Sequence, residues 1–308
     1  MLSIIIPVFN EEKNIAEMYR RLNDVKKQLD MPVEIIFVND GSKDASEEKV
    51  LQIREKDSTI KLLSFSRNFG HQIAVSAGLD HVSGEATVII DADLQDPPEV
   101  ILNLVEKWKE GYEVVYAQRI KRDGETFFKK YTAWLFYRVI NKIAGINIPV
   151  DTGDFRLIDK KVVENLRKIH ERNRFLRGLV TWVGFKQIAV PYERNARFAG
   201  TTKYPLKKMV RFAFDAITSF SHSPLQIATY LGFFISSFAF LASIYFLYLR
   251  FFTSISTPGF TTLILAILFL GGIQLITLGI IGEYIGRIYD ETKARPLYVI
   301  SEKIGFEK

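Results

Sequence analysis

The chain contains no cysteine among its 308 residues. Disulfide bonds and thiolate metal sites are therefore excluded, and any metal must be held by oxygen or nitrogen ligands. The nucleotide-binding fingerprints G-x-G-x-x-G and G-x-x-x-x-G-K-[ST] are also absent. Neither a dinucleotide-binding turn nor a P-loop is expected, so any nucleotide must be bound in another way.

Charge is missing from two long stretches near the C-terminus. Pro224–Leu249 is 26 residues long and Gly259–Gly282 is 24 residues long, and neither contains a charged side chain. About 20 apolar residues cross the core of a bilayer, whereas buried helices of globular proteins are usually shorter. The sequence therefore predicts two transmembrane helices, at about 224–249 and 259–282, within a membrane region at 223–286.

Basic residues are concentrated before the first apolar stretch, and Arg250 is the only charged residue in the short connection between the two stretches. The basic residues are Arg194, Arg197, Lys203, Lys207, Lys208 and Arg211. The positive-inside rule then predicts an inner-membrane protein with two spans, whose N-terminal domain and C-terminal tail (287–308) are both cytoplasmic. Met1–Pro7 lacks the basic start of a signal peptide and is expected to be a first strand.

The formal net charge of +6 suits anionic partners. Lipid headgroups and phosphorylated substrates are the expected ones, and no motif for nucleic-acid binding is present. In Leu206–Ser221, apolar residues recur at helical spacing opposite Lys207, Lys208 and Arg211. This pattern predicts an amphipathic helix at 205–222 in the bilayer interface, although a helix packed on the domain's own core would show the same pattern.

Short apolar runs alternate with charged, helix-compatible segments up to about residue 222. This alternation predicts an α/β domain at 1–204 with a doubly wound, mostly parallel sheet. The expected strands are Leu2–Val8, Glu34–Val38, Ile60–Phe65, Thr87–Ile90 and Glu113–Ala117. The expected helices are Asn14–Gln28, Ala45–Glu55, Gln72–His81 and Pro98–Glu110.

Asp91 and Asp93 directly follow the apolar run Thr87–Ile90, and Gln95 comes two residues later. Ligands of open α/β sheets bind at the carboxyl ends of strands. Carboxylate and amide oxygens suit Mg²⁺ or Mn²⁺ held between protein and substrate phosphates. The alternative is an ordinary solvated turn, and Asp96 is expected to help cap a helix that begins near Pro97.

Several other motifs lie at predicted strand ends. They are Pro7-Val8-Phe9-Asn10-Glu11-Glu12, Val38-Asn39-Asp40-Gly41-Ser42, Arg67-Asn68-Phe69-Gly70 and Asp151-Thr152-Gly153-Asp154-Phe155-Arg156. With the Asp91-Ala92-Asp93 motif, the apolar hairpin and the Gly282-Glu283-Tyr284 tail, the chain resembles family-2 glycosyltransferases of the GT-A fold. Within that family it resembles polyisoprenyl-phosphate glycosyltransferases, namely the bactoprenol glucosyltransferases and the dolichyl-phosphate mannose synthases. The resemblance covers essentially the whole chain.

The resemblance implies an inverting, metal-dependent enzyme. It would move a single sugar, with glucose favoured, from a UDP-sugar to undecaprenyl phosphate at the cytoplasmic membrane face, and a homo-tetramer is plausible. Galactose, N-acetylhexosamine, mannose and amino-arabinose remain open. The resemblance also implies a role for particular residues: Asp154 and Arg156 in catalysis; Pro7, Phe9, Glu11, Asp40, Arg67, Asp91 and Lys203 in donor binding; Arg119, Lys129 and Lys130 in binding the acceptor phosphate; and Asp91, Asp93 and Gln95 as metal ligands.

Not every position supports that interpretation. Ala133 stands where the family often has a hydroxyl side chain, so an acceptor contact there is in doubt. His71 and His81 lack the spacing of metal ligands, and we expect both to be structural. A processive polysaccharide synthase would need more spans and a Gln-x-x-Arg-Trp motif, which is absent. A membrane-anchored nucleotide-sugar-binding or scaffold protein with a degenerate site is the alternative from another class.

Overall fold

The computed structural model describes residues 1–120, 152–172, 174–193, 223–252 and 259–306. The chain divides into two compact units, of which the first comprises Met1–Ala213 together with Arg295–Lys308 and the second comprises Phe214–Ala294. The predicted interface helix at 205–222 lies outside the described residues, as does most of the segment between β5 and β6.

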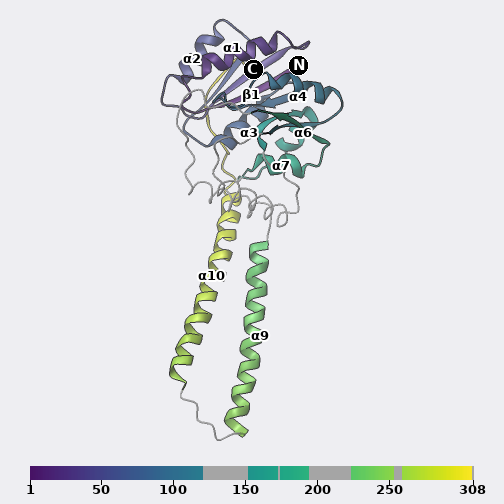
Figure 1. Cartoon of the computed structure of the whole chain (residues 1–308). Coiled ribbons are helices and arrows are strands. Elements are labelled where there is room, and N and C mark those ends of the chain that lie inside the picture. The colour runs from purple at the N-terminus through teal and green to yellow at the C-terminus, as the bar shows by residue number, and fades with distance from the viewer. Residues whose placement is uncertain (121–151, 173, 194–222, 253–258, 307–308) are drawn as a thin grey trace. The chain divides into compact units, whose positions relative to one another are not determined.

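The first unit is built on a single mixed sheet with helices on both faces (Figure 1). Its strands lie in the order β7-β5-β6-β4-β1-β2-β3-β8. Their bounds are β1 Leu2–Val8, β2 Val33–Asn39, β3 Ile60–Phe65, β4 Ala86–Ile89, β5 Val114–Arg119, β6 Thr152–Asp159, β7 Gln187–Tyr192 and β8 Ile300–Ile304. The helices of this unit are α1 Ile15–Lys26, α2 Ser46–Arg54, α3 His71–His81, α4 Val100–Lys109, α6 Lys160–Arg167 and α7 Leu176–Trp182.

The predicted doubly wound, mostly parallel sheet is confirmed. β1 pairs in parallel with β2 and β4, and β2 pairs in parallel with β3. Two strands run against this direction: β6 lies antiparallel between β4 and β5, and β8 pairs antiparallel with β3. β8 belongs to the segment that the sequence indicated only as a C-terminal tail, so part of this tail completes the edge of the sheet.

The period-two alternation of strand side chains divides the core between the two faces of the sheet. In β1, Ile4 and Ile6 join the apolar cluster that contains Met18 of α1 and Leu104 of α4. Ile5 points to the other face, where a Cβ on Gly78 of α3 would lie 2.5 Å from its Cγ2. α3 therefore packs closely on the sheet only because residue 78 is glycine. This packing places the start of α3 beside the strand ends.

Pro7 lies inside the central strand β1, where a proline removes a donor from the ladder. It is tolerated because pairing between β1 and β4 ends at Ile5 and Ile89, two residues before the proline. One further bond, from the Ile90 N–H to the Ile5 carbonyl oxygen at 3.1 Å, follows the ladder. The candidate site begins after it, at the carboxyl ends of β1 and β4.

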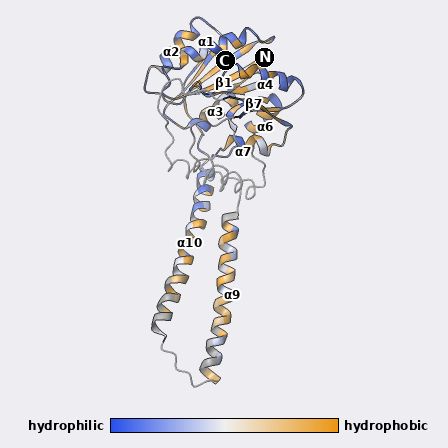
Figure 2. Ribbon diagram, viewed as in Figure 1, coloured by the Kyte–Doolittle hydropathy of each residue, from blue (hydrophilic) through white to orange (hydrophobic). Residues whose placement is uncertain are grey.

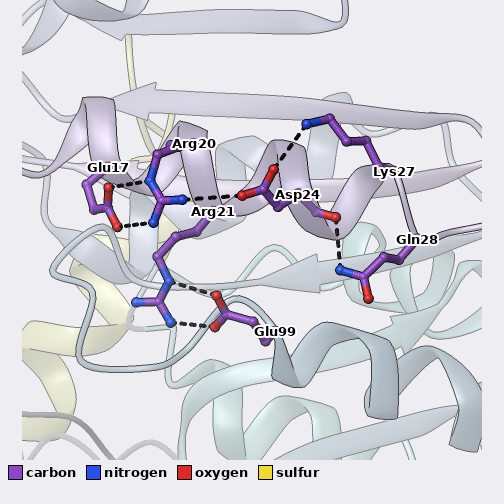
Figure 3. Close-up of polar contacts among 7 residues, drawn as sticks. All are labelled: Glu17, Arg20, Arg21, Asp24, Lys27, Gln28 and Glu99. Atoms are coloured by element: carbon purple, nitrogen blue, oxygen red, sulfur yellow. Dashed lines mark hydrogen bonds and ion pairs between the residues drawn. The ribbon is translucent and has the colours of Figure 1, made fainter.

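Ion pairs line the outer surface of α1, and one of them joins it to Glu99 at the start of α4 (Figure 3). The Arg21 guanidinium makes two hydrogen bonds to Glu99, one of them a 2.8 Å contact from Nε to Oε1. Along α1 itself, Arg20 bonds Glu17 at 2.7 Å and Asp24 at 3.3 Å. Exposed pairs of this kind contribute little, typically about 0–1 kcal/mol each. They orient the helices, while the buried apolar cluster stabilises the fold.

The second unit consists of the long helices α9, Ser223–Phe252, and α10, Phe260–Thr292. Hydrophobic residues predominate along α9 and along the first part of α10 (Figure 2). Leu225–Ala242 and Phe269–Thr292 are long and apolar enough to cross a membrane, and only 6% and 0% of these segments is buried. Exposed apolar helices of this length are typical of a membrane hairpin.

Candidate active site

The turn after β4 carries the acid pair at the carboxyl end of a central strand. Asp91 is partly exposed and Asp93 is buried, and Asp93 Oδ1 accepts a 3.1 Å hydrogen bond from the backbone N–H of Gln95. Between Asp93 and Gln95, Leu94 has a φ of 60° and is only 2% exposed. Such a backbone angle is unfavourable for a branched side chain, and strain of this kind is often found at functional sites. The turn is thus held in a specific, strained shape.

His71, the first residue of α3, lies between two carboxylates. Its Nε2 is 3.2 Å from Asp154 Oδ2 and 3.5 Å from Asp91 Oδ1. Burial would lower the pKa of His71, but the charges of Asp91 and Asp154 outweigh it and raise the pKa to about 9. His71 is therefore a cation at neutral pH that joins the end of β4 to β6.

We expected His71 to be structural, and the structure adds that it contacts two carboxylates of the candidate site. The expectation rested on the lack of metal-ligand spacing, but His71 acts as a partner of carboxylates. A useful signal was present in the sequence: His71 directly follows the Arg67–Gly70 motif and so comes after a strand end, as the other candidates do. His81 fits the expectation, since its Nδ1 is 2.8 Å from the carbonyl oxygen of Ala77 within α3.

Asp154 is bonded to side chains from two helices. Its Oδ1 accepts a 2.8 Å bond from Arg177 Nε of α7, and its Oδ2 accepts a 3.0 Å bond from Gln72 Nε2 of α3. Burial alone would raise the pKa of Asp154, but Arg177 and His71 hold it well below the usual range. Neither Arg177 nor Gln72 was predicted as a site residue, because only the tertiary fold brings α7 and α3 to β6.

Asp91 differs from Asp154. Burial raises the pKa of Asp91 to about 6; His71 opposes this rise, and the neighbouring carboxylates of Asp96, Asp154 and Asp93 add to it. Its Oδ1 accepts no hydrogen bond from the described residues, and its cationic neighbour is His71. A carboxylate in this position is short of positive charge, and a cation would relieve that shortage.

Asp91 and Asp93 with the amide oxygen of Gln95 form a set of hard oxygen donors that fits Mg²⁺ or Mn²⁺. No group of three or more acidic or histidine side chains in the described part of the chain is arranged to hold a metal alone. Magnesium sites in transferases usually contain only one or two protein carboxylates, and substrate phosphates and water complete them. The residues present therefore fit a cation that binds together with a phosphorylated ligand.

Asp40, at the end of β2, shapes the turn of residues 68–70. This carboxylate is only 3% exposed. It accepts hydrogen bonds from the backbone N–H groups of Phe69 at 2.6 Å and Gly70 at 3.0 Å, and from Asn68 Nδ2 at 2.9 Å. Asp40 thus anchors this turn, and the contact with the nucleotide base that the resemblance implies stays a prediction.

Gly41 allows the same turn to approach β2 closely. Its φ is 66°, and a Cβ at this position would lie 2.5 Å from the carbonyl carbon of Arg67. Arg67 itself is exposed, with its guanidinium 4.2 Å from the centre of the Phe69 ring. An exposed arginine stacked on an aromatic ring is preorganised to meet an anionic ligand.

The residues that the sequence predicted to bind the donor, Pro7, Phe9 and Glu11, lie at and just after the end of β1. Pro7 is buried within β1, and Phe9 is partly exposed just beyond it. Glu11 bonds Asn14 Nδ2 at 2.6 Å through Oε2, and its backbone N–H donates to Ser46 Oγ at 3.0 Å. Of these three predicted residues, Phe9 and Glu11 offer accessible side chains, and Pro7 shapes the strand end.

Arg119 and Arg156 lie on neighbouring strands. Arg156 is 5% exposed, and its Nη2 donates to the carbonyl oxygen of Gly153 at 2.9 Å. Arg119 Nε donates to the Tyr192 hydroxyl at 3.2 Å, and its Nη2 lies where a Cβ on Gly153 would be 2.8 Å away. Glycine at position 153 therefore leaves the space that the Arg119 side chain occupies.

Asp96 does not cap a helix, and this prediction was wrong. α4 begins at Val100 with Glu99 in the cap position. Asp96 is fully buried, accepts a hydrogen bond from the Tyr192 hydroxyl, and lies 3.8 Å from Arg119 Nη2. A buried carboxylate needs polar or charged partners. Asp96 has such partners in Arg119 on β5 and Tyr192 on β7. Lys129, Lys130 and Lys203 lie outside the described residues.

Comparison with known proteins identifies the architecture. Residues 3–167 match the family described as Glycosyl transferase family 2, and residues 223–288 match the GtrB C-terminal hairpin. An uncharacterized glycosyltransferase of Bacillus subtilis, YkcC, is 55% identical over 99% of this chain and 94% of its own length. A bactoprenol glucosyl transferase of Shigella phage SfV is 44% identical over 98% of each chain.

A third relative, the prophage bactoprenol glucosyl transferase homolog of Escherichia coli K12, is 44% identical over 97% of this chain and 98% of its own length. The matches include the sheet domain, the turn after β4, and the apolar hairpin. They extend over nearly the whole chain, as the resemblance seen in the sequence did. The chain therefore belongs to glycosyl transferase family 2, is a glycosyltransferase, and carries the GtrB C-terminal hairpin after its catalytic domain.

Proposed function

We propose that this enzyme transfers a single sugar, with glucose favoured, from a UDP-sugar to a polyisoprenyl phosphate such as undecaprenyl phosphate. Transfer would take place at the cytoplasmic face of the membrane, with inversion at the sugar carbon. The names of the phage and Escherichia coli relatives support a bactoprenol acceptor and a glucosyl group. The observation that carries the proposal is the His71, Asp91 and Asp154 cluster, where a partly exposed carboxylate short of positive charge lies beside a fixed ion pair.

The donor would bind across the ends of β1, β2 and β4. Phe9 and Glu11, which are partly exposed, would contact the base and ribose, and the exposed Arg67 would contact the diphosphate. Asp40 contributes indirectly, because its hydrogen bonds to the N–H groups of Phe69 and Gly70 hold the turn that presents Arg67.

Asp91, Asp93 and Gln95 would hold Mg²⁺ or Mn²⁺ against the donor. When bound, the cation neutralises the negative charge that collects on the leaving diphosphate. Two features of the chain support such a cation site. Asp91 Oδ1 accepts no hydrogen bond from the described residues, and the Leu94 backbone fixes the turn between Asp93 and Gln95.

The acceptor side would mainly orient charge. A lipid monophosphate has a second pKa near 6 and is largely a dianion at neutral pH, so it needs no strong base to attack the sugar. The depressed pKa of Asp154 makes that residue a poor proton acceptor. Its role would be to hold Arg177 and His71, and these cations with Arg119 would position the acceptor phosphate.

The connection of the chain supports this membrane placement. β8 comes after the hairpin in sequence, yet it pairs with β3 of the N-terminal domain. A chain with two spans between these strands has both of them on the same side of the bilayer. Because the polyisoprenyl tail stays in the membrane, at about 0.8 kcal/mol per buried CH₂, its phosphate has to be met at the interface. An amphipathic helix at 205–222, with Lys207, Lys208 and Arg211, would set that height.

A panel of labelled nucleotide-sugars tests this proposal. The purified full chain would be incubated with each sugar donor, undecaprenyl phosphate and Mg²⁺ or Mn²⁺, and the lipids would then be extracted. We expect one labelled sugar per lipid from a UDP-sugar, with UDP-glucose the best donor. Donor binding without a labelled lipid product would contradict the proposal, and a better donor other than UDP-glucose would change the sugar assigned.

A further inference from the structure

The segment after the membrane hairpin is fastened to the catalytic domain at several points. β8 pairs antiparallel with β3 through Leu62–Ile304, Leu63–Lys303 and Ser64–Glu302. Before the strand, Arg172 Nη1 donates to the Arg295 carbonyl oxygen at 2.9 Å, and the Tyr298 hydroxyl donates to Asp80 Oδ2 at 2.9 Å. The backbone N–H of Ser66 donates to the Val299 carbonyl oxygen at 3.0 Å. The contact therefore continues past the end of β3 toward the turn of residues 68–70.

A row of aromatic rings extends from this segment to the turn. The Tyr298 ring stacks on Phe65, with centroids 5.2 Å apart and planes at 17°. Phe65 then meets Phe69 edge to face, at 5.6 Å and 86°. The Arg67 guanidinium lies 4.2 Å from the centre of the Phe69 ring. Phe65 is only 4% exposed, so the row is a packed contact rather than a surface association.

The last ring in the row belongs to the turn that Asp40 anchors. The backbone N–H of Phe69 donates to Asp40 Oδ1 at 2.6 Å, so the main chain of Phe69 is held from one side and its ring from the other. Two constraints on one residue define its position better than one. Without the contact between the Phe65 and Phe69 rings, the turn would be held mainly by its hydrogen bonds to Asp40.

We propose that Tyr298, which follows the membrane hairpin, is a positioning residue for the donor-binding turn. It acts through Phe65 and Phe69 on the placement of Arg67, and it touches no reacting atom. The inference rests on the proposed function for the identity of the donor, but the positioning of the turn can be tested without any ligand.

Phe306 provides a matched control from the same segment. Its ring lies at the other end of β8, 5.6 Å from His81 and 5.0 Å from Lys61 Nζ. Phe306→Ala therefore removes an aromatic contact of the tail without removing the row that leads to Phe69. Tyr298→Phe keeps the stacked ring and removes only the hydrogen bond to Asp80.

Hydrogen exchange of the full chain in detergent tests the positioning. Tyr298→Ala should accelerate amide exchange in a peptide spanning 66–72. This peptide contains the N–H groups of Phe69 and Gly70, which donate hydrogen bonds to Asp40. Tyr298→Phe and Phe306→Ala should leave this peptide as in the wild type. Tyr298→Leu, which keeps apolar bulk but not the ring, serves if the alanine variant folds poorly. Equal acceleration in the Tyr298→Ala and Phe306→Ala variants, or none in either, would overturn the proposal.

UDP binding in the presence of Mn²⁺ tests the consequence. Tyr298→Ala should weaken UDP affinity about two- to tenfold, as expected for the loss of one aromatic pair, while Tyr298→Phe and Phe306→Ala should bind normally. Unchanged affinity in a variant with faster turn exchange would refute a role in donor binding. The two ideas can fail separately. If neither the wild type nor any variant bound UDP, the proposed donor would be rejected. The positioning role of Tyr298 would still hold if only Tyr298→Ala accelerated exchange at the turn.

Discussion

Individual charges at the site are fixed by neighbours from distant parts of the chain. Asp154 is bonded to Arg177 and Gln72 and lies against His71, so its charge is compensated and its pKa is held low. Asp91 has the opposite character, with a pKa raised to about 6. Two acids in one site with such different environments are expected to have different roles. Asp154 suits orientation, and Asp91 suits the binding of a cation.

Asp91→Asn should reduce turnover by about a hundredfold or more, because it removes a charged ligand from the proposed cation site. The thermal midpoint should stay the same or rise, since a carboxylate crowded by other carboxylates is lost. Initial rates of lipid product formation and a thermal melt measure the two effects. Glu48→Gln, an exposed acid on α2, is the control. A parallel fall in rate and stability would point to a folding defect instead.

His71→Gln should lower kcat about tenfold with little change in the KM for the donor. Glutamine can donate a hydrogen bond to Asp154, but it lacks the positive charge that lies between Asp154 and Asp91. Steady-state kinetics in both substrates give the two constants. A kcat equal to that of the wild type would show that the charge of His71 has no part in the reaction.

Glu34 provides a stability prediction away from the site. It is buried, accepts 2.6 Å and 2.8 Å bonds from Lys61 Nζ and the Ser83 N–H, and bonds Ser3. Burial would raise the pKa of Glu34, but these donors hold it below the ordinary value of a glutamate carboxyl. The stabilisation is therefore present above about pH 4.5 and is lost as the pH falls through the lower, folded pKa.

Glu34→Gln should thus reduce the free energy of unfolding at pH 7 by about 1–3 kcal/mol, and the difference from the wild type should shrink in acid. Denaturant unfolding of the full chain at pH 7 and pH 4 measures it. A constant difference at both pH values would mean that the charge of Glu34 contributes nothing.

At the scale of elements, the sequence predicted what is local. The strands from β1 to β5 and the helices between them follow the periodicity of apolar residues, so the acid pair after β4 could be placed at a strand end. The side chains of α3, α7, β6 and β7 that contact these acids could not be predicted as their partners. The local sequence pattern does not show which strands and helices become neighbours in the fold. The wrong prediction for Asp96 is an example. Its neighbours in sequence suggested a helix cap, whereas its hydrogen-bond partner, Tyr192, lies on β7.

β8 was missed for a related reason. Its residues, Ile300–Ile304, include an exposed Ser-Glu-Lys stretch, so the segment lacks the apolar alternation of a buried strand. It forms because β3 offers an unpaired edge, and charged residues are common on such edge strands. A strand of this kind depends on its partner rather than on its own propensity.

A chain that ends at Lys293 should therefore be less stable and more prone to aggregate, since it leaves the edge of β3 uncovered. We expect the melting midpoint of the catalytic domain to fall by at least about 4 °C, equivalent to roughly 1 kcal/mol or more. Lys303→Ala, on the exposed part of β8, is the control. Melting followed by light scattering gives both quantities. A midpoint unchanged by the truncation would mean that β8 adds no stability.

Truncation before Pro224 removes the same strand and should have the same effect.

At the scale of the whole molecule, sequence and comparison agree on a catalytic domain followed by a hairpin. Because β8 belongs to the catalytic sheet, a hairpin that crosses the membrane twice would return the chain to the side from which it started. The absence of cysteine makes this arrangement easy to test, since every introduced cysteine is unique.

Cysteines introduced at Lys13 and Glu302, which are both exposed, should be labelled from the same side of sealed vesicles. A cysteine at Ser254, in the connection between α9 and α10 and outside the described residues, should be labelled from the other side. A membrane-impermeant maleimide, applied before and after permeabilisation, distinguishes the two sides. Labelling of the Lys13 and Glu302 sites from opposite sides would contradict a two-span hairpin.

The most direct test of the central claim is the rate of lipid-linked sugar formation by the full chain as the divalent cation is varied. We predict no product with a chelator, recovery on adding Mg²⁺ or Mn²⁺, and one UDP released for each sugar on the lipid; Asp93→Asn should not recover at the same cation concentration. Full activity in the chelator, or UDP release without a lipid product, would contradict the claim that this site performs metal-dependent sugar transfer to a polyisoprenyl phosphate.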